Sequence, residues 1–328
     1  MKGTELNHLA ANVVLAPPDG YSFFGVERRV DDDIAVSQAA LRGEEPLFRA
    51  QLELDLYQFA YARPPGPPVA KDPVALPATA VPDSPGPDRI ETRTFTVDTA
   101  LADGSVVVLV DGVRLRLHPG AFVGTASQAR RLKPGDLVRR VDCRTQWGAQ
   151  AAYHRITGGP RPRPFRPGTD LRFYWNAPID IAPALLEGFT AALGRSAIPF
   201  LAKRLTGSGQ DDRRDSVVLY IDRRDQAAAE RPLRALHDAF ASSLRDEVPM
   251  FTWQLGPGLG YAEDPASGAS FGQERARLLA DALEARDGQD AFDSTLASAF
   301  RLAGLDPERA HRNCLHVDRR GGPEDWVW

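Results

Sequence analysis

Lys203 is the residue whose type and setting best suit acid–base chemistry. Only four of the 40 basic residues in this 328-residue chain are lysines. Lys203 lies in the run Ile198–Leu205, which predicts a strand, and strand alternation places it on the same side as Leu201 and Leu205. Burial and neighbouring cations both favour a neutral amine, which is a general base near neutral pH. The alternative is a lysine at a strand edge whose ammonium stays in solvent.

Two adjacent arginines, Arg213 and Arg214, precede the predicted strand Ser216–Asp222, which contains Tyr220. Guanidinium groups form bidentate contacts with phosphate and carboxylate groups, so this pair is a candidate anion site. The simpler interpretation is a surface ion pair between Arg213 and Asp215 at the start of the strand.

Arg275 occupies an unusual position for a charged residue. Helical spacing places it on the apolar side of its predicted helix, while Arg277 lies on the polar side and is expected to be solvated. The residues that share the face of Arg275 are Phe271, Leu278 and Ala282. A guanidinium directed at the core needs an anionic partner, for which Glu263 and Asp264 are candidates.

The histidines give little support for a metal site. None of the six forms an HExxH motif or another paired metal spacing. His316, in the strand-like segment Cys314–Val317, and His154 are candidate general acids. The glycines between Gly256 and Gly260 match no nucleotide-binding motif, so neither a metal nor an organic cofactor is expected.

Ser270 lies in a GxSxG pattern, Gly268–Gly272, just before a predicted helix. In a serine hydrolase this motif follows an apolar strand directly, but here Glu263, Asp264 and Pro265 precede it. With Gln273 three residues later, Ser270 also fits the capping box of the helix. A serine hydrolase is therefore the weaker alternative function.

The composition excludes several classes of protein. The formal charge of −4 requires no large basic surface for nucleic acid, and 43% hydrophobic residues suffice for a real core. Two cysteines cannot build a disulfide framework. The longest aliphatic run, Val106–Val110, is far too short for a membrane helix, and the N-terminus lacks the apolar core of a signal peptide. We expect a cytoplasmic protein.

The first half of the chain predicts a helix, a linker and a small antiparallel sheet. Pro46–Ala62 is apolar, free of internal glycine and predicts one helix. Nine prolines between Pro64 and Pro87 indicate a linker or long loop. The β-branched runs after it predict strands, two of them joined by Asp111-Gly112, a dipeptide typical of tight hairpin turns. The runs are Thr94–Val97, Ser105–Val110, Val113–Leu117, Leu137–Val141 and Ala151–Ile156.

The second half alternates strands and helices, so the fold class is α+β. Four helices are expected: one that ends at Gly194, Pro232–Leu244, one that begins after Ser270, and Phe292–Ala303. The segment from Gly256 to Ala269 predicts a glycine-rich loop. We expect an N-terminal helical region (1–63), a proline-rich linker (64–91) and an α+β domain (92–328) that is β-rich over 92–160 and mixed over 161–328.

Several segments of the second half resemble the HopA family of type III effectors and its bacterial biosynthetic relatives. The segments follow one another in order over about a hundred residues. Such a series is far more specific evidence of a resemblance than any single motif. The segments are Arg172–Asn176, Ile198–Lys203, Arg213–Tyr220, Pro249–Thr252, Gly256–Pro265 and Ser270–Arg277.

The resemblance implies a lyase of class V lanthipeptide or thioamitide pathways. Such relatives remove phosphate from phosphoserine or phosphothreonine in a precursor peptide and leave dehydroalanine or dehydrobutyrine. An aminoglycoside-phosphotransferase-like kinase would phosphorylate the peptide, and a cyclase is a further candidate partner. An elimination needs a base for the Cα proton and cations for the leaving phosphate.

By this resemblance Lys203 is the base, Arg213 and Arg275 bind phosphate, and nearby arginines keep Lys203 neutral. Tyr220 is a hydrogen-bond donor, and Tyr220, His154 and His316 are the candidates for the general acid. Further candidates for phosphate or substrate binding are Arg214, Arg277, Asn176 and Thr252. Polar support is expected from Asp215 and Glu263.

A non-catalytic protein is the main alternative: a partner that docks a leader peptide or the kinase, or a secreted effector. A retained fold does not establish retained chemistry. Lys203 discriminates between the two, because a docking module tolerates arginine at this position and a base does not.

Overall fold

A computed structural model gives the fold of the chain. The structure describes residues 3–17, 20–29, 47–68, 89–102, 104–110, 112–117, 122–125, 132–147, 153–159, 168–205, 212–287, 291–313 and 322–326. His316 and most of the proline-rich stretch lie outside these residues. Within them, none of the helices combines the length and apolar character that crossing a membrane requires. The same residues contain no group of three or more histidine, cysteine or acidic side chains arranged to hold a metal ion.

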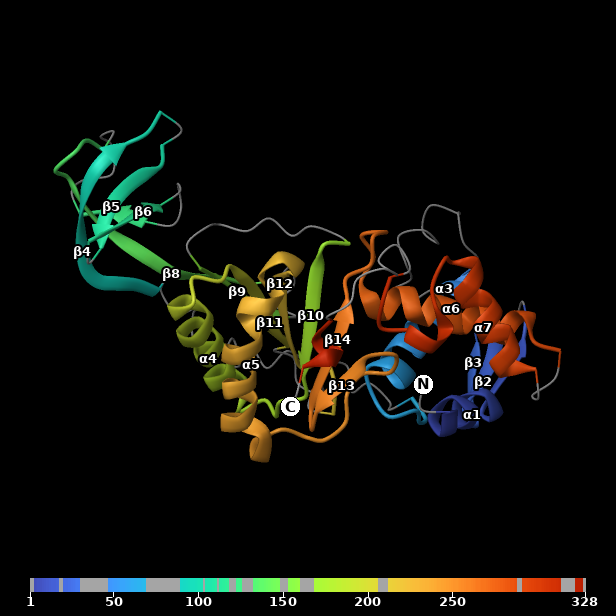
Figure 1. Ribbon diagram of the computed structural model, residues 1–328. Coiled ribbons are helices and arrows are strands. Elements are labelled where there is room, and N and C mark those ends of the chain that lie inside the picture. Colours follow the sequence, from blue (N-terminus) through green and yellow to red (C-terminus); the bar gives the residue numbers. More distant parts are fainter. Residues whose placement is uncertain are drawn as a thin grey trace.

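One large antiparallel sheet runs through the described part of the chain (Figure 1). Its strand order is β13-β14-β10-β12-β11-β9-β8-β4-β5-β6, and β7 pairs with β8. The strands are β4 (Arg89–Ala100), β5 (Val106–Val110), β6 (Val113–Leu117), β7 (Phe122–Gly124), β8 (Leu137–Trp147), β9 (Tyr153–Gly158), β10 (Asp170–Trp175), β11 (Phe200–Leu205), β12 (Val217–Asp222), β13 (Trp253–Gly256) and β14 (Leu259–Glu263).

Helices cover both faces of the central strands β10, β11 and β12, while β4, β5 and β6 stand away from them (Figure 1). Helices α4 and α5 lie on one side, and α6 and α7 lie on the other together with the N-terminal segment. These helices are α4 (Ala182–Arg195), α5 (Gln226–Phe240), α6 (Phe271–Ala285) and α7 (Phe292–Leu302). Short 3-10 turns occur at η3 (Arg223–Asp225), η4 (Ala241–Ser243), η5 (Pro307–Arg309) and η7 (Pro323–Asp325).

The sequence predicts a helical region for residues 1–63, and this prediction is incomplete. The described part of the region also contains a three-stranded sheet in the order β1-β2-β3. The elements are α1 (Gly3–Ala11), β1 (Val13–Ala16), β2 (Gly20–Phe23), β3 (Val26–Arg29), α3 (Leu47–Leu56) and the π-helical turn η1 (Tyr57–Tyr61). Their apolar side chains share one core with α6 and α7. The N-terminal segment therefore belongs to the same packed unit as the C-terminal half.

Most expected elements are present, but several boundaries differ, and strand β4 already begins at Arg89, inside the predicted linker 64–91. The predicted helix Pro232–Leu244 begins earlier, at Gln226, so that Pro232 lies inside α5. The predicted loop Gly256–Ala269 contains the buried strand β14. A tight turn at Gly258, whose φ is +66°, allows β13 and β14 to pair. A β-carbon on Gly260 would come within 2.8 Å of the Thr252 hydroxyl, so glycine is required inside this strand.

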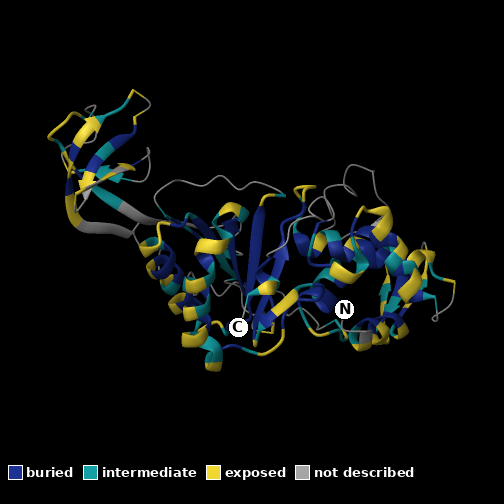
Figure 2. Ribbon diagram, viewed as in Figure 1, coloured by how far each residue is buried: buried dark blue, intermediate teal, exposed yellow. Residues whose placement is uncertain are grey.

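The two faces of β10, β11 and β12 have different compositions. The side chains directed at α4 and α5 form an apolar core, here called the apolar face: Leu171, Phe173, Trp175, Phe200, Ala202, Val217, Leu219 and Ile221. The alternate positions form the polar face, which includes Arg172, Tyr174, Lys203 and Tyr220. The central strands are largely buried, whereas much of β4, β5 and β6 is exposed or half-buried (Figure 2).

Candidate functional site

Lys203 and Tyr220 lie together on the polar face, as strand alternation predicts. The ammonium of Lys203, on β11, lies 5.8 Å from the centre of the Tyr220 ring on β12. The guanidinium of Arg172, on β10, lies 5.2 Å from the same ring. Tyr220 is thus placed between two cations contributed by the strands on either side of its own.

Arg213 and Asp215 form a buried, bidentate ion pair at the entrance to β12. The guanidinium Nε and Nη2 donate to the two carboxylate oxygens, each at 2.7 Å. Nη2 also donates to the Tyr57 hydroxyl at 2.9 Å. The predicted pairing is confirmed, but the pair is buried rather than on the surface. Because Tyr57 belongs to η1, the N-terminal segment contributes directly to this group of residues.

The contact between η1 and α6 depends on glycine. Tyr57 and Tyr61 stack with ring centres 5.6 Å apart. A β-carbon on Gly272 would lie 2.4 Å from the Tyr61 ring and 2.6 Å from the Tyr57 ring. Gly272 therefore lets the first turn of α6 approach both tyrosines, which positions the Tyr57 hydroxyl over Arg213 and Asp215.

Arg172 pairs with Asp264, which follows β14, and both side chains are buried. Burial raises the pKa of Asp264 to about 6, and the Arg172 guanidinium acts in the opposite direction. Asp215 differs, because the Arg213 guanidinium outweighs the effect of burial and lowers the pKa of Asp215. We call Lys203, Tyr220, Arg172, Asp264, Arg213, Asp215 and Tyr57 the Lys203 cluster.

The charge state of Lys203 differs from the sequence expectation. The electrostatic interaction with the Tyr220 side chain is the largest influence and raises the pKa of Lys203. Burial and Arg172 act in the opposite direction but are outweighed. Neighbouring arginines therefore do not keep this lysine neutral, and the free protein holds it as an ammonium at neutral pH. Among the described residues, no carboxylate forms an ion pair with it.

Arg275 is fully buried, as helical spacing predicts, but its partners are not the expected ones. The guanidinium pairs with neighbouring Glu274 and donates to the Ala310 carbonyl at 2.9 Å, rather than pairing with Glu263 or Asp264. It stacks over the ring of Phe271, with Cζ 4.5 Å from the ring centre. Burial lowers the pKa of Arg275 despite the carboxylate of Glu274. These contacts, together with the ring of Phe300 in α7, give it a role in packing α6 against α7 and the segment after η5.

The other candidates for phosphate binding lie outside the Lys203 cluster. Arg214 pairs with Glu5 at 2.9 Å. Arg277 is exposed on α6. Asn176 donates to the Glu247 carbonyl at 3.0 Å, and Thr252 donates to the Pro249 carbonyl at 2.6 Å, so both hold the segment before β13.

Of the two proposed histidine acids, the described one, His154, lies outside the cluster. His154 lies opposite Arg204 in the pairing of β9 with β11, on the face of the sheet that Lys203 does not share. Burial and then Arg204 lower the pKa of His154, so the neutral ring predominates. His316 lies outside the described residues. Glu263 also lies on the face opposite Lys203, where it pairs with Arg223 at 2.7 Å.

Ser270 caps a helix and is not placed as a nucleophile. Its hydroxyl accepts from the Gln273 amide at 3.2 Å, and the Gln273 side chain accepts from the Ser270 amide at 3.3 Å. Strand β14 ends seven residues earlier, at Glu263, so the strand-to-helix elbow of a hydrolase is absent from this described segment. The capping-box prediction is confirmed, and the interpretation of Gly268–Gly272 as a hydrolase motif is wrong.

Two residues of the cluster, Arg172 and Tyr57, and the neighbouring Arg155 escape the sequence reasoning. Arg172 and Tyr174 alternate with Phe173 and Trp175 in β10, and this pattern of polar and apolar residues could have revealed Arg172. Arg155 pairs in register with Lys203 across β9 and β11, but only the strand order reveals this. Tyr57 has no such signal, because its place depends on packing between distant segments.

Residues 155–312 match the model of the HopA1 effector protein family. No curated protein matches the chain. The structure of an effector protein from Pseudomonas syringae pv. tomato strain DC3000 aligns at 23% identity with a TM-score of 0.41, over 51% of this chain and 66% of that one. An effector from Pseudomonas syringae pv. syringae strain 61 aligns at 19% identity with a TM-score of 0.38, over 48% and 62%. The chain thus spans slightly less than two thirds of those effectors.

Proposed function

Because residues 155–312 form a HopA1-family segment, we propose that this protein is a lyase that eliminates phosphate from phosphoserine or phosphothreonine in a peptide. The products are dehydroalanine from phosphoserine and dehydrobutyrine from phosphothreonine. The peptide would be a ribosomally made precursor, phosphorylated beforehand by a separate kinase.

The excess of positive charge around Tyr220 is the observation that supports this proposal. Lys203, Arg172 and Arg213 are the cations of the cluster, whereas Asp215 and Asp264 are its carboxylates. The raised pKa of Asp264, about 6, reduces the negative charge further in mildly acidic solution. A phosphate dianion would balance this excess, and cations placed around a leaving phosphate stabilise the charge that develops on it.

In the proposed reaction, a base removes the Cα proton of the phosphorylated residue. The electrons of the Cα–H bond form the Cα=Cβ bond, and the Cβ–O bond breaks to release inorganic phosphate. The Lys203–Tyr220 pair is the proposed base, after it has lost one proton to solvent. Since the pKa of Lys203 is raised and its ammonium keeps the proton in the free protein at neutral pH, elimination should accelerate as the pH rises.

The test is mass spectrometry of a phosphothreonine peptide incubated with the protein. The peptide should be the precursor with its leader attached. Loss of phosphoric acid from the peptide, abolished in Lys203→Arg and reduced at least a hundredfold in Tyr220→Phe, is expected. Ser270→Ala is the control and should retain the activity. An intact phosphopeptide that still binds tightly would reject the lyase in favour of a docking protein.

A further inference from the structure

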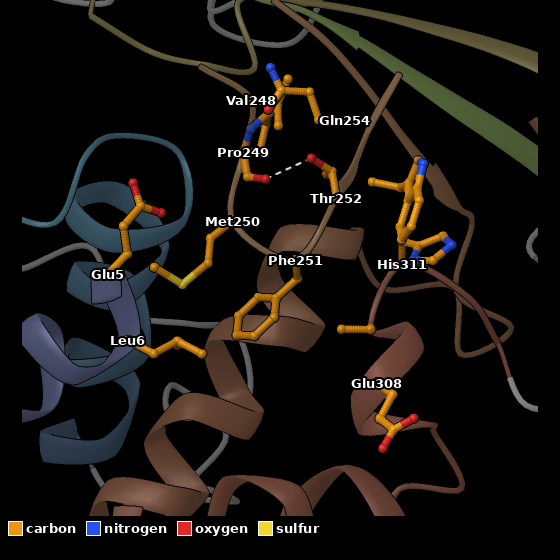
Figure 3. Close-up of a pocket in the computed structure, with 12 residues that line it drawn as sticks. Glu5, Leu6, Val248, Pro249, Met250, Phe251, Thr252, Gln254, Glu308 and His311 are labelled. Atoms are coloured by element: carbon orange, nitrogen blue, oxygen red, sulfur yellow. Dashed lines mark hydrogen bonds between the residues drawn. The ribbon is translucent and has the colours of Figure 1, made fainter. Parts of the chain in front are cut away.

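A pocket of about 280 Å³ opens on the side of the molecule where α1 approaches the segment before β13 (Figure 3). None of the residues of the Lys203 cluster lines it. Twelve residues form its wall: Glu5, Leu6, Val248, Pro249, Met250, Phe251, Thr252, Trp253, Gln254, Glu308, Ala310 and His311. They come from three separate parts of the sequence, so only the folded chain creates the pocket.

The wall combines apolar side chains with carboxylates. Met250 and Phe251 lie between Glu5 on one side and Glu308 on the other (Figure 3). The lining contains no lysine or arginine. Burial and then Arg312 lower the pKa of His311 to about 4, so this histidine adds no positive charge at neutral pH. The pocket is therefore both apolar and negatively charged.

The two carboxylates differ in what balances them. Glu5 pairs with buried Arg214 at 2.9 Å. Among the described residues, no basic side chain forms an ion pair with Glu308. Trp253, which is 45% exposed, lines the same pocket, and its ring centre lies 5.2 Å from that of His311. A pocket lined by both an unbalanced carboxylate and an exposed tryptophan is a favourable setting for an organic cation.

The backbone of the pocket is strained. Phe251 has a φ of +68°, a left-handed conformation that is rare for a bulky residue. The Phe251 side chain is held in the core against Phe300, with ring centres 5.5 Å apart. Packing therefore maintains the strained conformation, which shapes the pocket wall between Met250 and Trp253. Strain of this kind is concentrated at functional sites.

We propose that this pocket binds the side chain of a lysine or arginine in a peptide. The aliphatic stem would lie against Met250 and Phe251, and the charged end would meet Glu308 and the face of Trp253. Glu5 connects the pocket to the Lys203 cluster, because its partner Arg214 adjoins Arg213 in sequence. The assignment of the bound peptide as the substrate rests on the proposed function. If the bound peptide is the substrate, the pocket would select substrates that have a basic residue near the phosphorylated residue.

The test uses the full chain and two fluorescein-labelled nonapeptides without phosphate. One contains a single central arginine among glycine and serine residues, and the other contains citrulline, which has nearly the same shape but no charge. Fluorescence anisotropy should show about tenfold tighter binding of the arginine peptide. Glu308→Gln and Trp253→Ala should each remove most of this preference. Asp238→Asn is the matched control, because it removes an exposed negative charge from α5, on the other side of the sheet.

Equal binding of the two peptides, or an equal loss in Asp238→Asn and Glu308→Gln, would overturn the proposal. This result does not depend on catalysis, because neither peptide can undergo elimination. A preserved preference for arginine in a protein that leaves phosphopeptides intact would support the pocket and reject the lyase. Active elimination without any arginine preference would reject the pocket alone.

Discussion

The apolar and polar faces of the central sheet are built by the same three strands but have different properties. On the apolar face, Phe173 and Trp175 are fully buried against the layer formed by α4 and α5. On the polar face of the same strand, Arg172 is buried with Asp264 and lies over the ring of Tyr220. Residues adjacent in sequence thus serve an apolar core on one side and a charged cluster on the other.

The difference shows where charge is tolerated in this fold. A buried cation is costly unless a partner offsets its desolvation, and Arg172 and Arg213 each have a buried carboxylate. Lys203, which is only partly buried, has no such partner among the described residues. The polar face can therefore concentrate positive charge without disrupting the core, while the apolar face supplies hydrophobic stability. Substitutions on the two faces should separate activity from stability.

The largest effect is expected from Lys203→Met, which retains the length of the side chain and removes its charge. Elimination of phosphate from a phosphothreonine peptide should fall about 10⁴-fold, or ~5 kcal/mol in activation free energy. The free energy of unfolding should change little, because Lys203 is only partly buried. Single-turnover kinetics by mass spectrometry and urea unfolding of the same preparation measure the two quantities. A large loss of stability would mean that Lys203 contributes to folding, as the residues of the apolar face do, rather than to catalysis.

The next effect is expected from Phe173→Ala, one residue away from Arg172 but on the apolar face. Phe173 is fully buried and packs against Tyr261, with ring centres 5.8 Å apart. Removing this ring should cost about 4 kcal/mol in the free energy of unfolding, measured by urea denaturation. The activity of the fraction that remains folded should stay close to that of the unmodified chain. If the variant does not fold, Phe173→Leu provides a milder test, at about 1 kcal/mol.

Sequence alternation could predict this division of the faces, but only within each strand. The pattern around Lys203 places it correctly with Leu201 and Leu205, and the Ser270–Gln273 capping box defines the start of α6. These features depend on residues two to three positions apart, which the sequence displays directly. The fold class α+β is confirmed for the same reason.

The composition of the Lys203 cluster could not be predicted in this way. Tyr57 reaches Arg213 across 156 positions of sequence, through a contact between η1 and the entrance to β12. The charge state of Lys203 also depends on tertiary neighbours, since Tyr220 outweighs burial and Arg172. The sequence predicts a loop where β14 lies, because glycines, which normally indicate a loop, are needed there for a tight turn and for close approach to Thr252.

A smaller effect on stability is expected from substitution of the two cluster carboxylates, Asp264 and Asp215. Their pKa values are shifted in opposite directions in the folded chain. The pKa of Asp264 is about 6 in the folded chain, above the unfolded value of about 4. The folded state therefore binds more protons between these values, so stability falls by ~2 to 3 kcal/mol as the pH rises from about 4 to above 6. Asp264→Asn should remove this dependence in urea titrations at each pH.

Asp215→Asn is the matched comparison for Asp264→Asn. Because the pKa of Asp215 is lowered in the folded chain, its ionised form contributes stability above the unfolded pKa, and this contribution disappears as the pH falls. The substitution should destabilise the protein at neutral pH and have less effect in acid. Identical pH profiles for the two variants would contradict the difference in charge state between the two ion pairs.

The smallest effect is expected from Ser270→Ala, which distinguishes a structural residue from a catalytic one at the edge of the polar face. Loss of the hydroxyl that caps α6 should lower the free energy of unfolding by about 1 kcal/mol, measured by urea denaturation. Gln273→Ala removes the reciprocal hydrogen bond of the same capping box and should also destabilise the chain. Both variants should retain elimination activity, since Lys203 and Tyr220 keep their positions on the sheet. A loss of activity in Ser270→Ala but not in Gln273→Ala would give the serine hydroxyl a chemical role that its capping geometry does not predict.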